Sequence, residues 1–155
     1  MLFSESVYKF MYAALQEAEL ASEEDEVPIG AVVVHKNMII GRGHNQTERL
    51  NDATAHAEIL AITAASNHLK SKYLTDCDLY VTVEPCLMCS GAILLSHINN
   101  LYFSTFEPKL GACGSIYNVL ENNKYNRTIN IFNGVYSDES KNLLQTFFRK
   151  KRKPK

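Results

Sequence analysis

Apolar residues in the first twenty positions recur at intervals that predict an amphipathic helix. The spacing is three and four residues, as on one face of a helix with 3.6 residues per turn. The residues that carry the pattern are Val7, Phe10, Met11, Ala14, Leu15 and Ala18. Charged residues, from Glu5 to Glu19, interrupt the same segment. It therefore lacks the continuous apolar stretch of a signal peptide.

Short runs rich in β-branched residues predict five strands. "PIGAVVV" (28–34) and "MIIGRG" (38–43) flank the polar turn "HKN", which predicts a hairpin. "CDLYVTV" (77–83) predicts a compact buried strand. Two later segments, "NLYFST" (100–105) and "TINIF" (128–132), predict the remaining strands.

Three further helices are predicted between and after these strands. The first is expected to start at a polar cap residue and run to about Leu69. The candidates for this cap are Asn51, Asp52 and Thr54. The second is predicted over "CLMCSGAILLSHI" (86–98), directly after Pro85. The last is expected to be capped by Ser137 or Asp138. The residues predicted on its buried face are Leu143, Leu144, Phe147 and Phe148.

The order of these elements predicts an α/β fold. Alternating strands and helices favour one sheet with helices on both faces, and the opening hairpin makes that sheet mixed. The chain has 155 residues, of which 46% are apolar, so a single domain over residues 1–155 is expected. No segment has the length of a membrane span.

The charge is nearly balanced overall but uneven along the chain. The net charge is -1, which excludes a global basic field for nucleic acid. "EAELASEEDE" (17–26) carries six acids, whereas "RKKRKPK" (149–155) carries six bases. A basic helix and tail is thus expected from about residue 138. It either binds a polyanion or is a solvated terminus.

Cysteine usage predicts a metal or redox site in a reducing, cytoplasmic compartment. Cys86 and Cys89 share one face of a helix's first turn and can bind one metal ion. A lone CxxC also fits a redox pair or half of a structural zinc site, although a second CxxC is absent. Cys77 and Cys113 are expected to be buried as small apolar residues.

His56 can complete a three-ligand set with Cys86 and Cys89. It lies 30 residues before Cys86, near the start of the preceding predicted helix. If both helices begin at one sheet edge, these side chains converge. Three protein ligands with one open position are typical of catalytic zinc. Taken alone, His56 also fits an ordinary polar or core histidine.

Glu58 follows His56 by two residues in "TAHAEIL" (54–60). A carboxylate beside a zinc-bound water can take its proton and deliver it to the substrate. Alone, it also fits a helix-dipole partner. Together, His-x-Glu and a later Pro-Cys-x-x-Cys form a signature of zinc-dependent nucleobase deaminases. We expect His56 and Glu58 in the first helical turn, directed past its end.

Around these motifs the chain resembles the bacterial tRNA adenosine deaminases of the cytidine-deaminase-like superfamily. The resemblance covers nearly the whole chain, including "VPIGAVVV", "FEPKLGACGS" and "LLQTFFRKKRK". It implies a three-layer αβα sandwich with a five-stranded mixed sheet, a homodimer and one Zn²⁺ per subunit. It also implies conversion of adenosine to inosine at the wobble position (34) of a tRNA anticodon stem-loop.

The resemblance also implies roles for individual residues. The zinc ligands would be His56, Cys86 and Cys89, and Glu58 would carry protons. Candidate substrate contacts are Asn45, Ala57, Pro85, Glu107, Phe147, Phe148 and Arg149. Glu107 stands where some relatives have Asp, and Ser140 where some have cysteine. The first departure concerns an RNA contact, and neither touches the catalytic motif.

The expected reaction is hydrolytic deamination of an adenosine that has left the anticodon-loop stack. Hydroxide attacks adenine C6, and Glu58 protonates the ring nitrogen and then helps ammonia to leave. An alternative is a deaminase of free cytidine, deoxycytidylate or guanine, since the zinc chemistry is almost the same. A zinc-stabilised RNA-binding module without activity is the second alternative.

Overall fold

The computed structural model describes residues 2–121 and 124–152, which form four helices and five strands. In chain order the elements are α1 (Glu5–Glu23), β1 (Gly30–His35), β2 (Met38–His44), α2 (Ala57–Leu69), β3 (Cys77–Val83), α3 (Leu87–Leu95), β4 (Asn100–Thr105), β5 (Asn130–Asn133) and α4 (Ser137–Arg152). The expected order of helices and strands is confirmed.

The five strands form one mixed sheet in the order β2-β1-β3-β4-β5. β1 is antiparallel to both β2 and β3, whereas β3, β4 and β5 run parallel to one another. The hairpin therefore supplies the antiparallel part, as the sequence predicted. The parallel strands β3 and β4 are joined through α3, which is the usual crossover for parallel neighbours.

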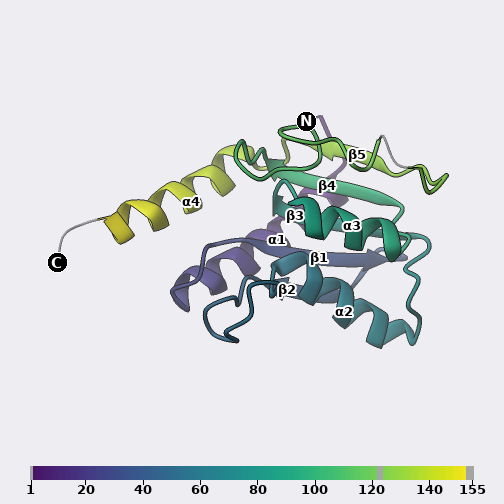
Figure 1. The fold of residues 1–155 in the computed structure, drawn as a ribbon, viewed down its shortest axis with the longest axis horizontal. Helices are drawn as coiled ribbons and strands as arrows, with labels where there is room; N and C mark the ends of the chain where they lie inside the picture. The colour runs from purple at the N-terminus through teal and green to yellow at the C-terminus, as the bar shows by residue number, and fades with distance from the viewer. Residues whose placement is uncertain (1, 122–123, 153–155) are drawn as a thin grey trace.

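Helices cover both faces of the sheet and make three layers. α1 packs on β1 and β3, and α4 packs on β4, while α2 packs on β2 and β1 (Figure 1). Successive residues of β1 serve different faces, because side chains alternate along a strand. Val33 joins the core beneath α2 and α3, and Val32 joins the core beneath α1. The α/β three-layer expectation is confirmed.

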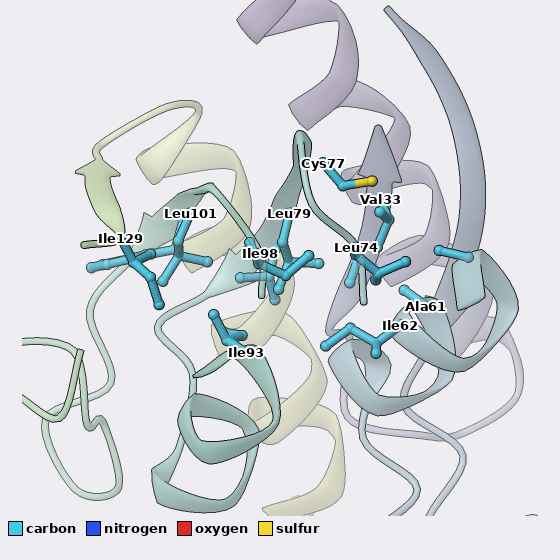
Figure 2. Close-up of a cluster of buried hydrophobic side chains, with 14 of the residues drawn as sticks. Val33, Ala61, Ile62, Leu74, Cys77, Leu79, Ile93, Ile98, Leu101 and Ile129 are labelled. Carbon is cyan, nitrogen blue, oxygen red and sulfur yellow. The ribbon is translucent and has the colours of Figure 1, made fainter. Parts of the chain in front are cut away.

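The core beneath α2 and α3 is built mainly from aliphatic side chains. Figure 2 shows Ile62 from α2 and Ile93 from α3 facing Val33, Leu79 and Leu101 from three neighbouring strands. Four of these five side chains are fully buried, and Ile62 is almost so. This packing fixes the two helices that carry the expected metal ligands.

Two glycines in β2 let α2 lie unusually close to the sheet. A Cβ atom at Gly43 would overlap the carbonyl oxygen of Ala57, the first residue of α2. A Cβ atom at Gly41 would overlap the carbonyl oxygen of Ala61, one turn later. Glycine at these positions therefore sets the height of the α2 N-terminus above the sheet.

Two expected helix boundaries are wrong. α2 is not capped by Asn51, Asp52 or Thr54, because Asp52 accepts hydrogen bonds from Thr54 in the preceding turn and His56 takes the cap position. α3 ends at Leu95 rather than at 98. His97 has a φ of 62°, which is left-handed and cannot continue a helix.

The last strand and the last helix also depart from expectation. β5 starts at Asn130 rather than at 128, and Ser137 is the first residue of α4 rather than its cap. Phe147 is buried, but Phe148 is 44% exposed and does not belong to the buried face. Neighbouring helical residues point about 100° apart, so a helix that contacts the sheet over a narrow strip buries only one of them.

Cys77 and Cys113 are buried, as expected. Burial raises the pKa of the Cys77 thiol to about 11 and that of the Cys113 thiol to about 12. Both thiols therefore stay protonated in the core. Among the described residues, no helix combines the length and apolar character needed to cross a membrane.

Candidate active site

The two helices that carry the expected ligands begin at the same edge of the sheet. His56 is the N-cap residue of α2 and Cys86 is the N-cap residue of α3. Neither side chain makes the hydrogen bond to the first helical turn that an N-cap residue commonly makes. Both are therefore available to a ligand beyond the helix ends.

The three donor atoms lie at separations that fit one tetrahedral metal ion. His56 Nδ1 is 3.6 Å from Cys86 Sγ and 3.5 Å from Cys89 Sγ. All three donor atoms lie within 4.8 Å of one another. Zinc–sulfur bonds of about 2.3 Å and zinc–nitrogen bonds of about 2.0–2.1 Å at tetrahedral angles place N and S about 3.6 Å apart. The residues present thus fit a metal centre with one position left open.

Hydrogen bonds within the cluster shift the pKa values of all three donor groups. A hydrogen bond from Cys89, together with one from His56, lowers the pKa of Cys86 to about 4. The hydrogen bond to Cys86 raises the pKa of His56. The hydrogen bond to Cys86 and burial raise the pKa of Cys89. A divalent cation would replace these shared protons.

Glu58 lies in the first turn of α2, as the sequence predicted. Its side chain is almost fully buried, and burial raises the pKa of its carboxyl group. Cys86, His56 and Cys89 are close enough to contribute to that pKa. The carboxyl group therefore lies beside the metal-binding cluster, in a poorly solvated place that disfavours its charged form.

Two of the predicted substrate contacts, Ala57 and Pro85, directly adjoin His56 and Cys86 in the chain, and a third, Asn45, lies at the end of β2. Asn45 directly follows β2 and is buried, and its Oδ1 has no hydrogen-bond partner among the described residues. Ala57 is buried at the start of α2. The carbonyl oxygen of Pro85 already accepts a hydrogen bond from the N–H of Ala112, at 2.9 Å. A second lone pair on that oxygen remains for a ligand.

Glu107 lies in the segment that follows β4. Its backbone N–H donates to Glu84, and its own carboxylate accepts a hydrogen bond from the N–H of Lys109, at 2.9 Å. Its carbonyl oxygen accepts from Gly111. The side chain of Glu107 therefore stabilises its own turn, and it is half-buried there.

The predicted aromatic residues of α4 lie across a cavity from the segment that follows Asn45. A cavity of about 700 Å³ separates α4 from residues 24–27 and 47–49, and Phe147 and Phe148 contribute to its wall. Lys151 and Asp25 also line this cavity, and they form an ion pair at 2.6 Å. Arg149 is exposed.

Two buried glutamates near the site escaped the sequence analysis. Glu26 is 1% exposed and accepts hydrogen bonds from the backbone N–H groups of Glu48 and Arg49. Glu84 is 3% exposed and precedes Pro85 directly. An acid at the end of an apolar strand, as in "YVTVE", is the one signal that could have revealed Glu84.

Comparison with known proteins identifies the class to which this site belongs. A family model described as MafB19-like deaminase matches residues 5–152. The tRNA-specific adenosine deaminase of Aquifex aeolicus (strain VF5) is 44% identical over 143 residues, which cover 92% of this chain and 94% of that protein.

Solved structures agree with this result. A structure from a study of A-to-I editing by tRNA:A34 deaminases at the wobble position superposes with a TM-score of 0.84 and 43% identity, covering 88% of this chain and 99% of that one. The guanine deaminase from Nitrosomonas europaea superposes with a TM-score of 0.78 over 95% of this chain and 86% of that one. At 24% identity it shows a shared fold alone.

The match extends over nearly the full described length, and it includes both helix starts that carry the metal-binding cluster. The chain belongs to the deaminase family that contains the bacterial tRNA-specific adenosine deaminases.

Proposed function

We propose that this protein hydrolyses adenosine to inosine and ammonia at the wobble position (34) of a tRNA anticodon loop. The observation that carries the proposal is the metal-binding triangle of His56, Cys86 and Cys89 with buried Glu58 beside it. It occurs in a chain that is 44% identical to a tRNA-specific adenosine deaminase. Residues 1–155 form a single deaminase domain that acts in the cytoplasm.

The metal in this proposal is Zn²⁺, with one ion per subunit held by His56, Cys86 and Cys89. One imidazole and two thiolates are ligands that zinc prefers, and their separations fit its tetrahedral geometry. When bound, zinc supplies Lewis-acid activation of a water molecule at neutral pH.

Glu58 is the proton carrier. It takes one proton from the attacking water and delivers it to N1 of the adenine ring as oxygen bonds to C6. It then passes the second proton of that water to the leaving amino group, so that ammonia departs and the C6 carbonyl of inosine forms. Burial raises the pKa of Glu58, which makes its carboxylate a stronger base toward the proton of the water.

Asn45 and the backbone around the metal cluster orient the nucleoside. The buried Asn45 Oδ1 has no donor among the residues that the structure describes, so a hydroxyl or amino group of the substrate can supply one. The backbone N–H of Ala57 and the carbonyl of Pro85 then contact the edge of the base. A buried acceptor left without a donor costs free energy, which favours a substrate that fills this position.

The anticodon loop lies against α4 and the turn that contains Glu107. The exposed ring of Phe148 offers a stacking surface for an unpaired base, while Phe147 supports it edge-on at 5.4 Å between ring centroids. Arg149 lies in the basic last turn of α4 and reaches phosphates. A single-stranded loop costs less to open than a duplex, which favours an anticodon loop as substrate.

A homodimer is part of the proposal. α3 exposes two leucines two helical turns apart, Leu87 at 55% and Leu95 at 68%. Residues eight apart differ by about 80° around a helix, so both leucines lie on the broad side of α3 that faces away from the core. A second copy of the chain would remove this apolar surface from water.

The deciding experiment incubates zinc-loaded protein with an anticodon stem-loop that carries adenosine at the wobble position. We expect inosine in the digested RNA, identified by mass spectrometry, and no conversion of free adenosine, cytidine, deoxycytidylate or guanine. Turnover of a free base without turnover of the stem-loop would favour the alternative activity. Tight stem-loop binding without any inosine would favour a non-catalytic RNA-binding module.

A further inference from the structure

The carboxylate of Glu84 is one of the most completely hydrogen-bonded side-chain groups among the described residues. Its Oε1 accepts from the N–H of Glu107 at 3.0 Å and from the hydroxyl of Ser115. Its Oε2 accepts from the N–H groups of Cys113 at 2.9 Å and Ser115 at 3.0 Å. All four donors come from the segment 105–115, which the carboxylate therefore organises from inside.

The same segment is tied by its backbone to the metal-binding turn. The N–H of Glu84 donates to the carbonyl of Thr105 at 2.8 Å, and the N–H of Ala112 donates to the carbonyl of Pro85 at 2.9 Å. Cys86 forms a β-bridge with Gly111. A Cβ atom at Gly111 would overlap the Glu84 carboxyl group, so the backbone approaches it as closely as glycine allows.

Lys109, in the middle of the segment, forms part of a basic pocket. Lys109 lies across from α4 in a pocket of about 350 Å³, together with Lys141 and Arg152. Its remaining lining residues are Leu144, Gln145 and Phe148. In the described part of the chain none of these three cations forms an ion pair, so their charges are open to an anion. The segment thus contacts the metal-binding turn on both sides of Lys109, and Lys109 itself belongs to a cationic surface.

We propose that Glu84 is a positioning residue that holds segment 105–115 in the shape that binds the RNA substrate. This inference rests on the proposed function. The carboxylate does not touch the reacting atoms, and it acts through the loop that carries Glu107 and Lys109. Its loss leaves the metal ligands in place but releases the loop, because three backbone N–H groups lose their acceptors.

The test is Glu84→Gln, which keeps the shape of the side chain but turns one acceptor oxygen into an NH₂ donor. We expect KM for the stem-loop to rise about tenfold, kcat to stay within about twofold, and zinc content to stay at one ion per subunit. The matched control is Glu23→Gln, which removes the same charge from an exposed position of α1. Removing a negative charge strengthens RNA binding in general, so the predicted weakening has the opposite sign to a simple charge effect.

A positioning role also predicts graded behaviour in a second pair of variants. Glu84→Asp retains the charge and should recover part of the lost affinity. Ser115→Ala removes only one donor and should raise KM about twofold, which keeps the test decisive if Glu84→Gln does not fold. An unchanged KM in a folded Glu84→Gln or Ser115→Ala protein would overturn the proposal, as would a loss of kcat with KM unchanged. Wild-type protein is assayed first, and its failure to produce inosine would refute the proposed function instead.

Discussion

His56 and Glu58 lie two residues apart at the start of α2, and the helix geometry separates their tasks. His56 occupies the cap position with extended backbone, so its ring reaches beyond the helix end toward both cysteines. Glu58 belongs to the first helical turn and is buried beside the same cluster. The side chains of a cap residue and a first-turn residue can thus approach the same point. Two residues with this spacing in the middle of a helix would point in nearly opposite directions.

Replacing Glu58 with Gln should abolish catalysis without loss of the metal. General acid-base catalysis contributes about 10²–10⁴-fold to rate, so kcat should fall by at least that range. The metal ligands are unchanged, and zinc content should stay near one per subunit. Stem-loop assays and metal analysis measure the two quantities, and a Glu58→Gln enzyme with wild-type kcat would refute the proton-carrier role.

The same substitution should not lower the stability of the metal-free protein. Burial raises the pKa of Glu58, so the folded state disfavours its charged form. This lowers the free energy of unfolding at any pH above the raised pKa of Glu58 in the folded state. The effect shrinks as the pH falls below that pKa and is gone below the pKa that Glu58 has in the unfolded chain. At pH 7.5 the Gln variant should therefore melt at the same temperature as metal-free wild type or higher. A clearly lower melting temperature would show that the carboxyl group stabilises the fold.

At the scale of elements, periodicity predicted each helix and strand and placed β3 and β4 to the residue, but it missed the start of α2 and the end of α3. α1 was predicted closely because its apolar spacing persists over several turns. The start of α2 was missed because His56 replaces the usual capping residue where a ligand position is needed. The buried Glu84 was missed because its donors lie 23–31 residues further along the chain. Only the tertiary fold brings them together.

The close contact between β2 and α2 makes Gly43 sensitive to substitution. Gly43→Ala should destabilise the protein by about 1–3 kcal/mol, because the added methyl group overlaps Ala57 and forces α2 away from the sheet. The metal ligand His56 would move with the helix, so zinc affinity should fall as well. Denaturant unfolding and zinc titration measure these effects.

Gly91→Ala provides the control for this prediction. An added Cβ atom there meets no other atom within 4 Å, and alanine favours a helix more than glycine does. Its stability should equal or exceed that of the wild type. Equal stability of Gly43→Ala and wild type would contradict the packing argument.

The basic last turn of α4 should set the salt dependence of RNA binding. Replacing Arg149, Lys150 and Arg152 with Ala should weaken stem-loop binding and reduce the slope of log K against log salt, by about 0.7 per lost contact to single-stranded phosphate. Lys151 is kept because it pairs with Asp25. Arg42→Ala, on the exposed side of the edge strand β2, is the control. A triple variant with an unchanged slope would exclude phosphate contacts by this turn.

At the scale of the whole molecule, the fold gathers its functional groups at one sheet edge, while α4 projects beyond the sheet (Figure 1). The α/β class, the mixed sheet and the metal cluster all followed from patterns in the sequence. The exposure of Phe148 and the path of segment 105–115 did not, because both depend on how far one element reaches over another. Such contacts produce no periodic pattern of apolar residues in the sequence.

The exposed leucines of α3 should control the oligomeric state. Leu95→Lys places a charge on the proposed interface, and it should shift the protein from dimer to monomer in sedimentation equilibrium. Leu2→Lys, at a position that is 94% exposed, should leave the dimer intact. A Leu95→Lys protein that still sediments as a dimer would place the interface elsewhere.

A metal ion held by His56 and Cys86, 30 residues apart, would join α2 to α3 and close a ring of the chain between them. An ion bound there works as a cross-link, comparable in loop-closure entropy with a disulfide worth about 3–4 kcal/mol. Unlike a disulfide, it survives in a reducing environment and opens when the metal is withdrawn. The supply of zinc in the cell would then govern how long each molecule persists, as well as whether it is active.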